Sequence, residues 1–155
     1  MHFTLADLVT DIVQNGVESG ADLVELFISE NPDTPGRGFS FTVRDNGKGM
    51  TAEELEKAKD PFVSDGIKHP RRRVGLGIPF LIQTAESTGG MWKIESRKGK
   101  GTEVKARFNL DNPDTPPVGD IPEMLRSAML FGGSTEIVIK VNGEQLDEQS
   151  FDNKE

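Results

Sequence analysis

The chain has 155 residues, of which 34% are hydrophobic and 28% are charged, and its formal net charge is −8. This length suits one domain with a single core, while the negative charge argues against a general binder of nucleic acid or of anionic membranes, because both require a positive field. The absence of cysteine excludes disulfides, thiolate metal sites and a cysteine nucleophile. Since no apolar run reaches the roughly 18 residues of a membrane span and the first residues do not resemble a signal peptide, we expect a cytoplasmic protein.

The first predicted element is an amphipathic helix over residues 5–20, with Thr4 as its N-cap and Asp7 three residues later in an acidic variant of the capping box. Asp11 and Asn15 fall one turn apart on its polar face. An amide oxygen and a nearby carboxylate suffice for a magnesium ion that bridges a triphosphate. Asn15 is the candidate metal ligand, and Asp11 would orient or deprotonate a nucleophile or hold a metal-bound water. The same stripe could instead be the solvated side of the helix.

Two strands are predicted next, over residues 22–29 and 39–44, and a box of sequence Asp-Asn-Gly-Lys-Gly-Met follows the second. The carboxylate at the start of this box would accept the exocyclic amine of adenine. The two glycines would let the backbone turn tightly and approach a flat base. Alone, Asp-Asn-Gly is an ordinary turn sequence. The candidate ATP-binding residues of this box are Asp45, Gly47, Gly49 and Met50.

Thr51 is the predicted N-cap of a short helix that runs to about Lys59, and a loop of about fifteen residues follows it. A Gly-Leu-Gly-Ile box then opens a helix that ends near Ser87. Backbone N–H groups at such a helix start bind anions, and the basic run at 68–73 could close over phosphates. A flexible hinge and a solvated charge run are the alternatives. The candidate ATP-binding residues here are Gly75, Leu76, Gly77, Ile78, Lys68 and Arg73.

A hairpin is predicted from strands 91–97 and 102–110, around a glycine-rich turn. Thr102, at the start of its second strand, could share a water with Asp45 and adenine, although a turn needs no such role. We expect residues 1–110 to form the main domain.

Residues 111–155 are expected to extend the same domain with a linker, a short helix over 122–131, a strand over 135–141 and a frayed acidic end. The helix would cover its own sheet or a partner, and the strand would extend the edge of its own sheet or of a partner's sheet. The apolar side of the helix comprises Ile121, Met124, Leu125, Ala128 and Met129.

Four boxes occur in this order: the helix with Asp11 and Asn15, the box at 45–50, the box at 75–78, and Gly-Thr at 101–102. Together they make the chain resemble the GHKL ATPase superfamily, which is named for gyrase, a heat-shock chaperone, histidine kinases and a mismatch-repair ATPase. The match covers about residues 5–110. The stretch 15–21 is similar to the mismatch-repair branch, and the glycine boxes at 75–78, 89–90 and 99–102 are similar to the kinase branch. The resemblance implies an α+β Bergerat fold, a two-layer α/β sandwich with helices on one face of a mixed sheet and a lid between the second and third boxes.

The resemblance also implies roles for individual residues. Asn15 would bind magnesium, and Asp45 would read adenine with Thr102 in support. Gly47 and Gly49 would pack by the base. Gly75 and Gly77 would bind phosphate.

Two features depart from the family's pattern. Glutamate usually stands where this chain has Asp11, and a misplacement of about 1 Å can cost on the order of a hundredfold in rate. No phosphoacceptor-histidine helix pair precedes the first box, so we do not expect a complete self-phosphorylating histidine kinase.

We expect an Mg-ATP-binding module that acts on a protein partner, either as a kinase in trans, like the anti-sigma kinases of the family, or as an ATP-gated regulator. The alternatives are a non-catalytic nucleotide-sensing subunit that docks on a larger enzyme or dimerises, and a weak stand-alone ATPase. In each case the ligands of this module would be ATP, ADP and Mg2+.

Overall fold

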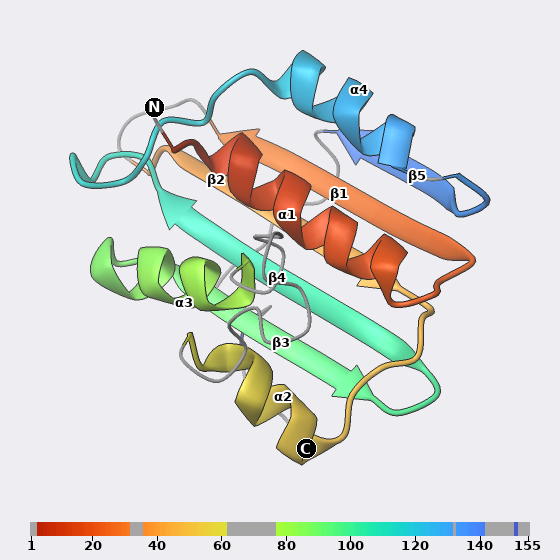
Figure 1. Ribbon diagram of the computed structural model, residues 1–155. Helices are drawn as coiled ribbons and strands as arrows, with labels where there is room; N and C mark the ends of the chain where they lie inside the picture. The colour runs from red at the N-terminus through yellow and green to blue at the C-terminus, as the bar shows by residue number, and fades with distance from the viewer. Residues whose placement is uncertain (1–2, 32–35, 62–76, 132, 142–150, 152–155) are drawn as a thin grey trace.

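The computed structural model describes residues 3–31, 36–61, 77–131, 133–141 and 151 (Figure 1). Its helices are α1 (Leu5–Glu18), α2 (Ala52–Lys59), α3 (Gly77–Ser87) and α4 (Ile121–Phe131). Its strands are β1 (Leu23–Asn31), β2 (Gly38–Asp45), β3 (Met91–Arg97), β4 (Gly101–Asn109) and β5 (Glu136–Val141). None of these helices combines the length with the apolar character that crossing a bilayer requires.

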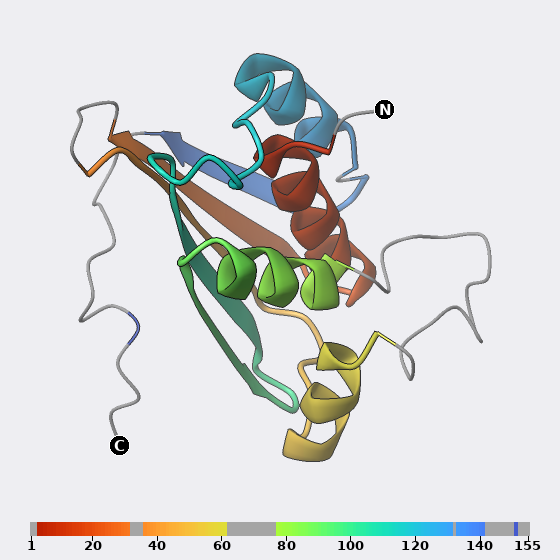
Figure 2. The ribbon, with the colours of Figure 1, turned by 90° about the vertical axis from the view of Figure 1, so that its left-hand side faces the viewer.

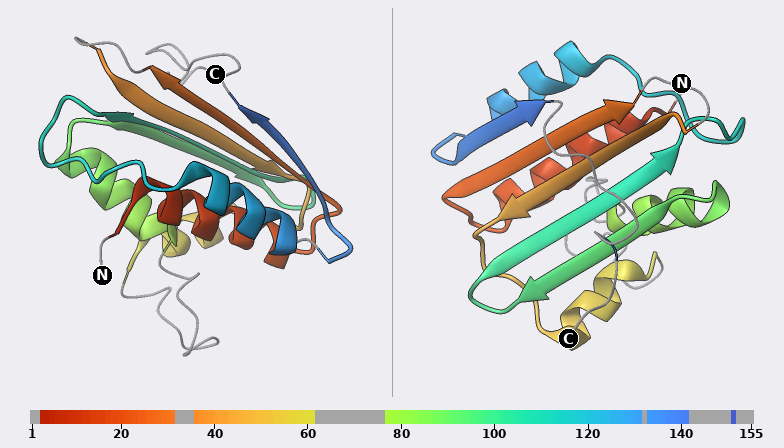
Figure 3. Two further views of the ribbon diagram at one scale, coloured as in Figure 1. Left: turned by 90° about the horizontal axis from the view of Figure 1, so that it is seen from above. Right: turned by 180° about the vertical axis from the view of Figure 1, so that it is seen from behind.

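The strands form one five-stranded sheet in the order β3-β4-β2-β1-β5. The pairs β1–β2, β2–β4 and β3–β4 are antiparallel, whereas β1 and β5 run parallel. All four helices lie on the same face of this mixed sheet (Figures 2 and 3). The expected α+β sandwich with helices on one face is therefore confirmed.

Local capping chemistry sets the starts of α1 and α2. The Thr4 hydroxyl accepts the Asp7 N–H at 3.0 Å, and the Asp7 carboxylate accepts the Thr4 N–H at the same distance. Thr51 and Glu54 make the equivalent reciprocal pair at the start of α2. Both predicted N-caps are confirmed, because each pair satisfies two backbone donors that the helix leaves unpaired.

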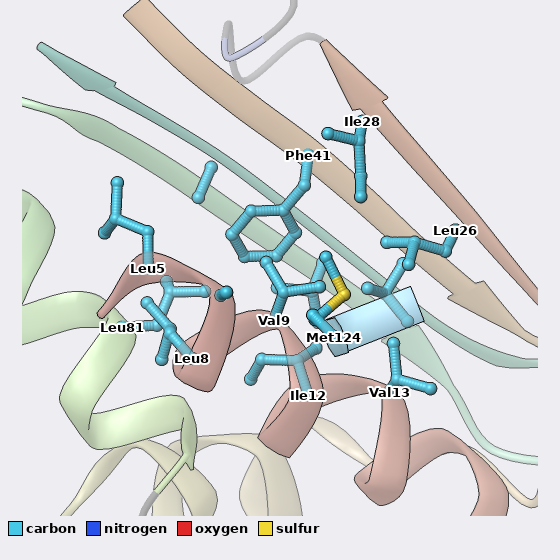
Figure 4. Packing of buried hydrophobic residues seen from close by; sticks show 14 of the residues in the cluster. Leu5, Leu8, Val9, Ile12, Val13, Leu26, Ile28, Phe41, Leu81 and Met124 are labelled. Atoms are coloured by element: carbon cyan, nitrogen blue, oxygen red, sulfur yellow. The ribbon is translucent and has the colours of Figure 1, made fainter. Parts of the chain in front are cut away.

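The core lies between the helices and one face of the sheet. Alternate residues of the strands point toward α1 and α3, where apolar side chains interdigitate (Figure 4). The burial of this face of α1 supplies the main stabilisation of the helix, as is usual for amphipathic helices. The side chains labelled in Figure 4 are Leu5, Leu8, Val9, Ile12, Val13, Leu26, Ile28, Phe41, Leu81 and Met124.

The opposite face of the sheet is polar, with a cross-strand charge row in place of a second core. Arg44 on β2 lies 3.4 Å from Glu25 on β1 and 2.8 Å from Glu103 on β4. Its guanidinium also lies over the Phe27 ring at 5.4 Å. This face therefore needs no helical layer to cover it.

The helix and strand after residue 110 pack on the rest of the chain. Met124 is 3% exposed and joins the core beside α1, and β5 adds a parallel strand to β1. The apolar side expected for this helix included Met129, but that side chain is 57% exposed. α4 lies at one side of the sheet, so only part of its apolar side faces the core. Met129 falls outside that part.

Candidate functional site

A cavity of about 280 Å³ opens between the C-terminal half of α1 and the sheet. This volume is close to the lower end of the range for small-molecule sites, about 300–1,000 Å³. Six residues expected from the sequence line it, namely Asn15, Asp45, Gly49, Met50, Ile78 and Thr102. The remaining wall consists of Ile12, Gly16, Glu18, Ser19, Val43, Lys48, Ala58 and Val104.

Asp45 supplies the buried carboxylate of this cavity. It is the last residue of β2 and is only 9% exposed. Its Oδ1 accepts the Gly47 N–H at 2.8 Å and the Ser19 hydroxyl at 3.3 Å. Burial raises the pKa of Asp45, and hydrogen bonds from Gly47, Ser19 and the Thr102 backbone oppose that rise. The cavity thus contains a positioned acceptor whose ionised form is costly to bury.

The other carboxylate oxygen, Oδ2, lies beside Gly16 of α1. An ideal Cβ on Gly16 would lie 3.3 Å from Asp45 Oδ2 and 3.3 Å from Val24 Cγ2. A larger residue at this position would cover the carboxylate. With glycine at this position, α1 places no side chain over Oδ2.

The two glycines of the Asp-Asn-Gly-Lys-Gly box are packed against other parts of the protein. A Cβ on Gly47 would lie 2.7 Å from the Ser19 Cβ, and Gly47 itself does not line the cavity. Gly49 has φ +68°, and a Cβ there would lie 2.7 Å from the carbonyl carbon of Arg97. Both glycines permit a close approach of protein to protein, at the end of α1 and at the β3–β4 turn. Only Gly49 also faces the cavity.

Ser96 joins this loop to the start of β4. Its hydroxyl accepts the Met50 N–H at 2.8 Å, donates to the Gly101 carbonyl at 3.1 Å and lies 2.8 Å from the Thr102 hydroxyl. Thr102 is paired with Asp45 in the β2–β4 register. A short chain of contacts therefore runs from the box after β2 through Ser96 to the strand opposite Asp45.

Asn15 and Asp11 occupy different positions around the site. Asn15 lines the cavity, whereas Asp11, one turn earlier, does not. Both lie beside the start of α3, because a Cβ on Gly77 would be 3.4 Å from Asp11 Cβ and 3.5 Å from Asn15 Nδ2. The first and third boxes therefore meet at this point. Of the remaining expected residues, Lys68, Arg73, Gly75 and Leu76 lie outside the described residues.

Residues 3–112 match the family model for "Histidine kinase-, DNA gyrase B-, and HSP90-like ATPase". The chain belongs to this ATPase family. The resemblance drawn from the four boxes is thus confirmed, and the domain is an ATP-binding domain of the histidine-kinase-like type. The match ends before α4 and β5 begin.

Curated relatives of this ATPase domain include sensor kinases. The Sensor kinase CckA of Brucella abortus is 29% identical over 123 residues, which are 77% of this chain and 13% of the relative. The Histidine protein kinase DivJ of Caulobacter vibrioides is 39% identical over 71 residues, which are 45% of this chain and 12% of the relative. The histidine kinase domain of a blue-light-activated kinase from Erythrobacter litoralis has 16% identity and a TM-score of 0.34, over 59% of this chain and 35% of that one.

Three residues in or beside this cavity, Ser19, Ser96 and Gly16, were not identified as site residues from the sequence. The strand pattern contained a signal for Ser96, because it is the polar member of the helix-facing series Trp92, Ile94 and Ser96. Gly16 and Ser19 lie in the stretch 15–21 that resembles the mismatch-repair branch, but nothing in that resemblance pointed to a contact with Asp45. Their contacts with Asp45 depend on how the end of α1 crosses β2.

Proposed function

We propose that this ATPase-family domain binds Mg-ATP in the cavity beside α1 and recognises adenine through Asp45. The observation that carries the proposal is the Asp45 carboxylate, 9% exposed and held through Oδ1, with Oδ2 beside the side-chain-free Gly16. Adenine offers an amine donor at its exocyclic position, whereas guanine offers a carbonyl. A buried acceptor therefore favours ATP over GTP, because the wrong base would leave it unpaired.

The apolar part of the cavity suits a flat base. The cavity is lined with hydrocarbon by Ile12, Val43, Ile78 and Val104, which come from α1, β2, α3 and β4. Small-molecule sites typically combine such apolar walls with a few placed polar groups. The base would enter this apolar space, and its amine would meet Asp45.

Asn15 is the proposed magnesium ligand. Its side chain lines the cavity next to the start of α3, which is where the phosphates would extend. No cluster of three or more acidic or histidine side chains suited to a metal is found among the residues that the structure describes. The proposed site therefore fits a magnesium ion that takes one protein oxygen and draws its remaining ligands from phosphate and water. Bound magnesium would neutralise phosphate charge.

Isothermal titration calorimetry with ATP, ADP and GTP tests the adenine assignment. Asp45→Asn replaces the acceptor oxygen with an amide and should weaken ATP binding by about a hundredfold or more. Asp114→Asn makes the same chemical change at an exposed position far from the cavity and should bind ATP like the wild type. Equal ATP affinity in the two variants, or equal affinity of the wild type for ATP and GTP, would refute the role of Asp45.

We also propose that the domain acts on a protein partner, either by passing on the γ-phosphate in trans or by reporting which nucleotide is bound. One observation favours this over a stand-alone ATPase. The two curated relatives described above are kinases, and this chain spans only 12–13% of their length.

Two measurements separate these roles. Transfer of label from γ-labelled ATP to a co-purified protein indicates a kinase in trans, and nucleotide-dependent capture without transfer indicates a regulator. Rapid phosphate release by the purified chain, abolished in Asp11→Ala while nucleotide binding is retained, would instead establish a self-contained ATPase.

A further inference from the structure

β5 forms one edge of the sheet in the part of the chain that the structure describes. β5 is the last strand of the sheet, and no described strand pairs with its outer side. The Glu136 N–H donates to the Asp22 carbonyl at 2.8 Å, so Glu136 directs its backbone groups toward β1. Because alternate residues of a strand bond to opposite sides, Ile137 and Ile139 direct their N–H and C=O groups outward. The outer edge of β5 therefore presents the backbone donors and acceptors of Ile137 and Ile139.

The two elements at this end of the sheet carry exposed apolar side chains. Among the described residues, four large hydrophobic side chains are exposed, and three of them belong to α4 and β5. Leu130 is 84% exposed, Met129 is 57% exposed and Val141 is 48% exposed. α4 lies alongside β5 at this end of the sheet (Figures 1 and 2). A free strand edge beside exposed apolar groups is a typical pairing surface.

The sequence of β5 is complementary to itself. In an antiparallel pair related by a two-fold axis at Val138, Glu136 of each copy lies opposite Lys140 of the other, and Ile137 lies opposite Ile139. The isoleucine pairs then carry the backbone hydrogen bonds, because their groups point outward. The Glu136–Lys140 pairs occupy non-hydrogen-bonded positions, where opposing side chains come closest. A shift of two residues in either direction would lose both charge pairs.

We propose that β5 pairs with β5 of a second copy of this chain in that register. The contact uses the same residues from both copies, as a two-fold interface requires. It joins the two sheets into one and satisfies the outward backbone groups. Glu136 and Lys140 are both exposed in the single chain. Lys140 Nζ lies 5.9 Å from the Phe27 ring centroid, on the sheet face away from the helices. Glu136 is four residues earlier in the same strand and so lies on the same face. Both charges are therefore available to pair.

Sedimentation equilibrium of the full chain over a range of concentrations tests the proposal. The wild type should form a concentration-dependent dimer. Glu136→Lys places two lysine pairs across the two-fold axis and should raise the dimer dissociation constant about tenfold or more. Lys140→Glu places two glutamate pairs across the axis and should raise the dimer dissociation constant by a similar factor. The double variant Glu136→Lys/Lys140→Glu restores both pairs in the reverse sense and should dimerise about as well as the wild type.

Glu53→Lys is the matched control, because it makes the same charge change on α2, where the side chain is 83% exposed. It should dimerise like the wild type. Circular dichroism identifies any variant that has lost its fold, and rescue by the double variant cannot arise from unfolding. A wild type that stays monomeric, single variants as tight as the control, or a double variant as weak as the singles would each overturn the proposal.

Discussion

Gly49→Ala tests whether the box after β2 is shaped by contact with the β3–β4 turn. Gly49 has φ +68°, a left-handed conformation that costs an L-residue about 1–2 kcal/mol. The added Cβ would also lie 2.7 Å from the Arg97 carbonyl carbon and 3.1 Å from the Gly101 nitrogen. These are backbone atoms of the hairpin, so relief requires a backbone shift that costs about 1–3 kcal/mol more. We expect a loss of about 2–5 kcal/mol in the free energy of unfolding.

Gly99→Ala is the matched control for this prediction. Gly99 lies in the neighbouring turn with φ +82°, and a Cβ there would meet no atom within 4 Å. It therefore carries the conformational cost alone, about 1–2 kcal/mol. Urea denaturation of both variants measures the difference, and calorimetry with ADP should show weakened binding only for Gly49→Ala, because Gly49 lines the cavity. Equal losses of stability in the two variants would refute the steric reasoning.

Three further predictions concern the polar residues of the site. Burial raises the pKa of Asp45 above its ordinary 3.8, so stability contributed by the protonated form is lost as pH rises through the raised value. The stability of Asp45→Asn relative to the wild type should therefore grow over that pH window and then level off; a constant difference in denaturation midpoints contradicts this. Ser96→Ala leaves the Met50 N–H without its partner and should cost about 1–3 kcal/mol and weaken nucleotide binding. Ser87→Ala, at an exposed serine on α3, is the control, and denaturation and calorimetry compare the two variants. Equal stability and equal nucleotide affinity in the two variants would exclude a positioning role for Ser96. Asn15→Ala should reduce ATP affinity more with magnesium than without it, as measured by calorimetry in the presence and absence of EDTA; equal losses would count against a metal ligand.

Much of the secondary structure could be predicted because its causes are local. The reciprocal caps at Thr4 and Thr51 use residues three positions apart, so the helix starts can be identified without knowledge of the fold. The strand periods identified the β3–β4 hairpin around its glycine turn. The boxes also pointed to Asp45, which the structure places on the wall of a cavity.

Other parts of the site depend on contacts between segments that lie far apart in the chain. Ser19 reaches Asp45 across 26 positions, and Ser96 reaches Met50 across 46. Neither serine carries a pattern that names its partner. The crossing of α1 over β2 and the position of the β3–β4 turn decide both contacts.

The amino-acid sequence by itself determined the order of the elements, the helix starts and the ATPase family, because capping residues, hydrophobic periods and glycine boxes act over a few neighbouring positions. Only the tertiary structure decided that β5 runs parallel to β1 at the sheet edge, that Met129 faces outward and that Asp11 lies outside the cavity wall. The physical reason is that sheet order and burial depend on which distant surfaces exclude water together. Short-range patterns leave that choice open.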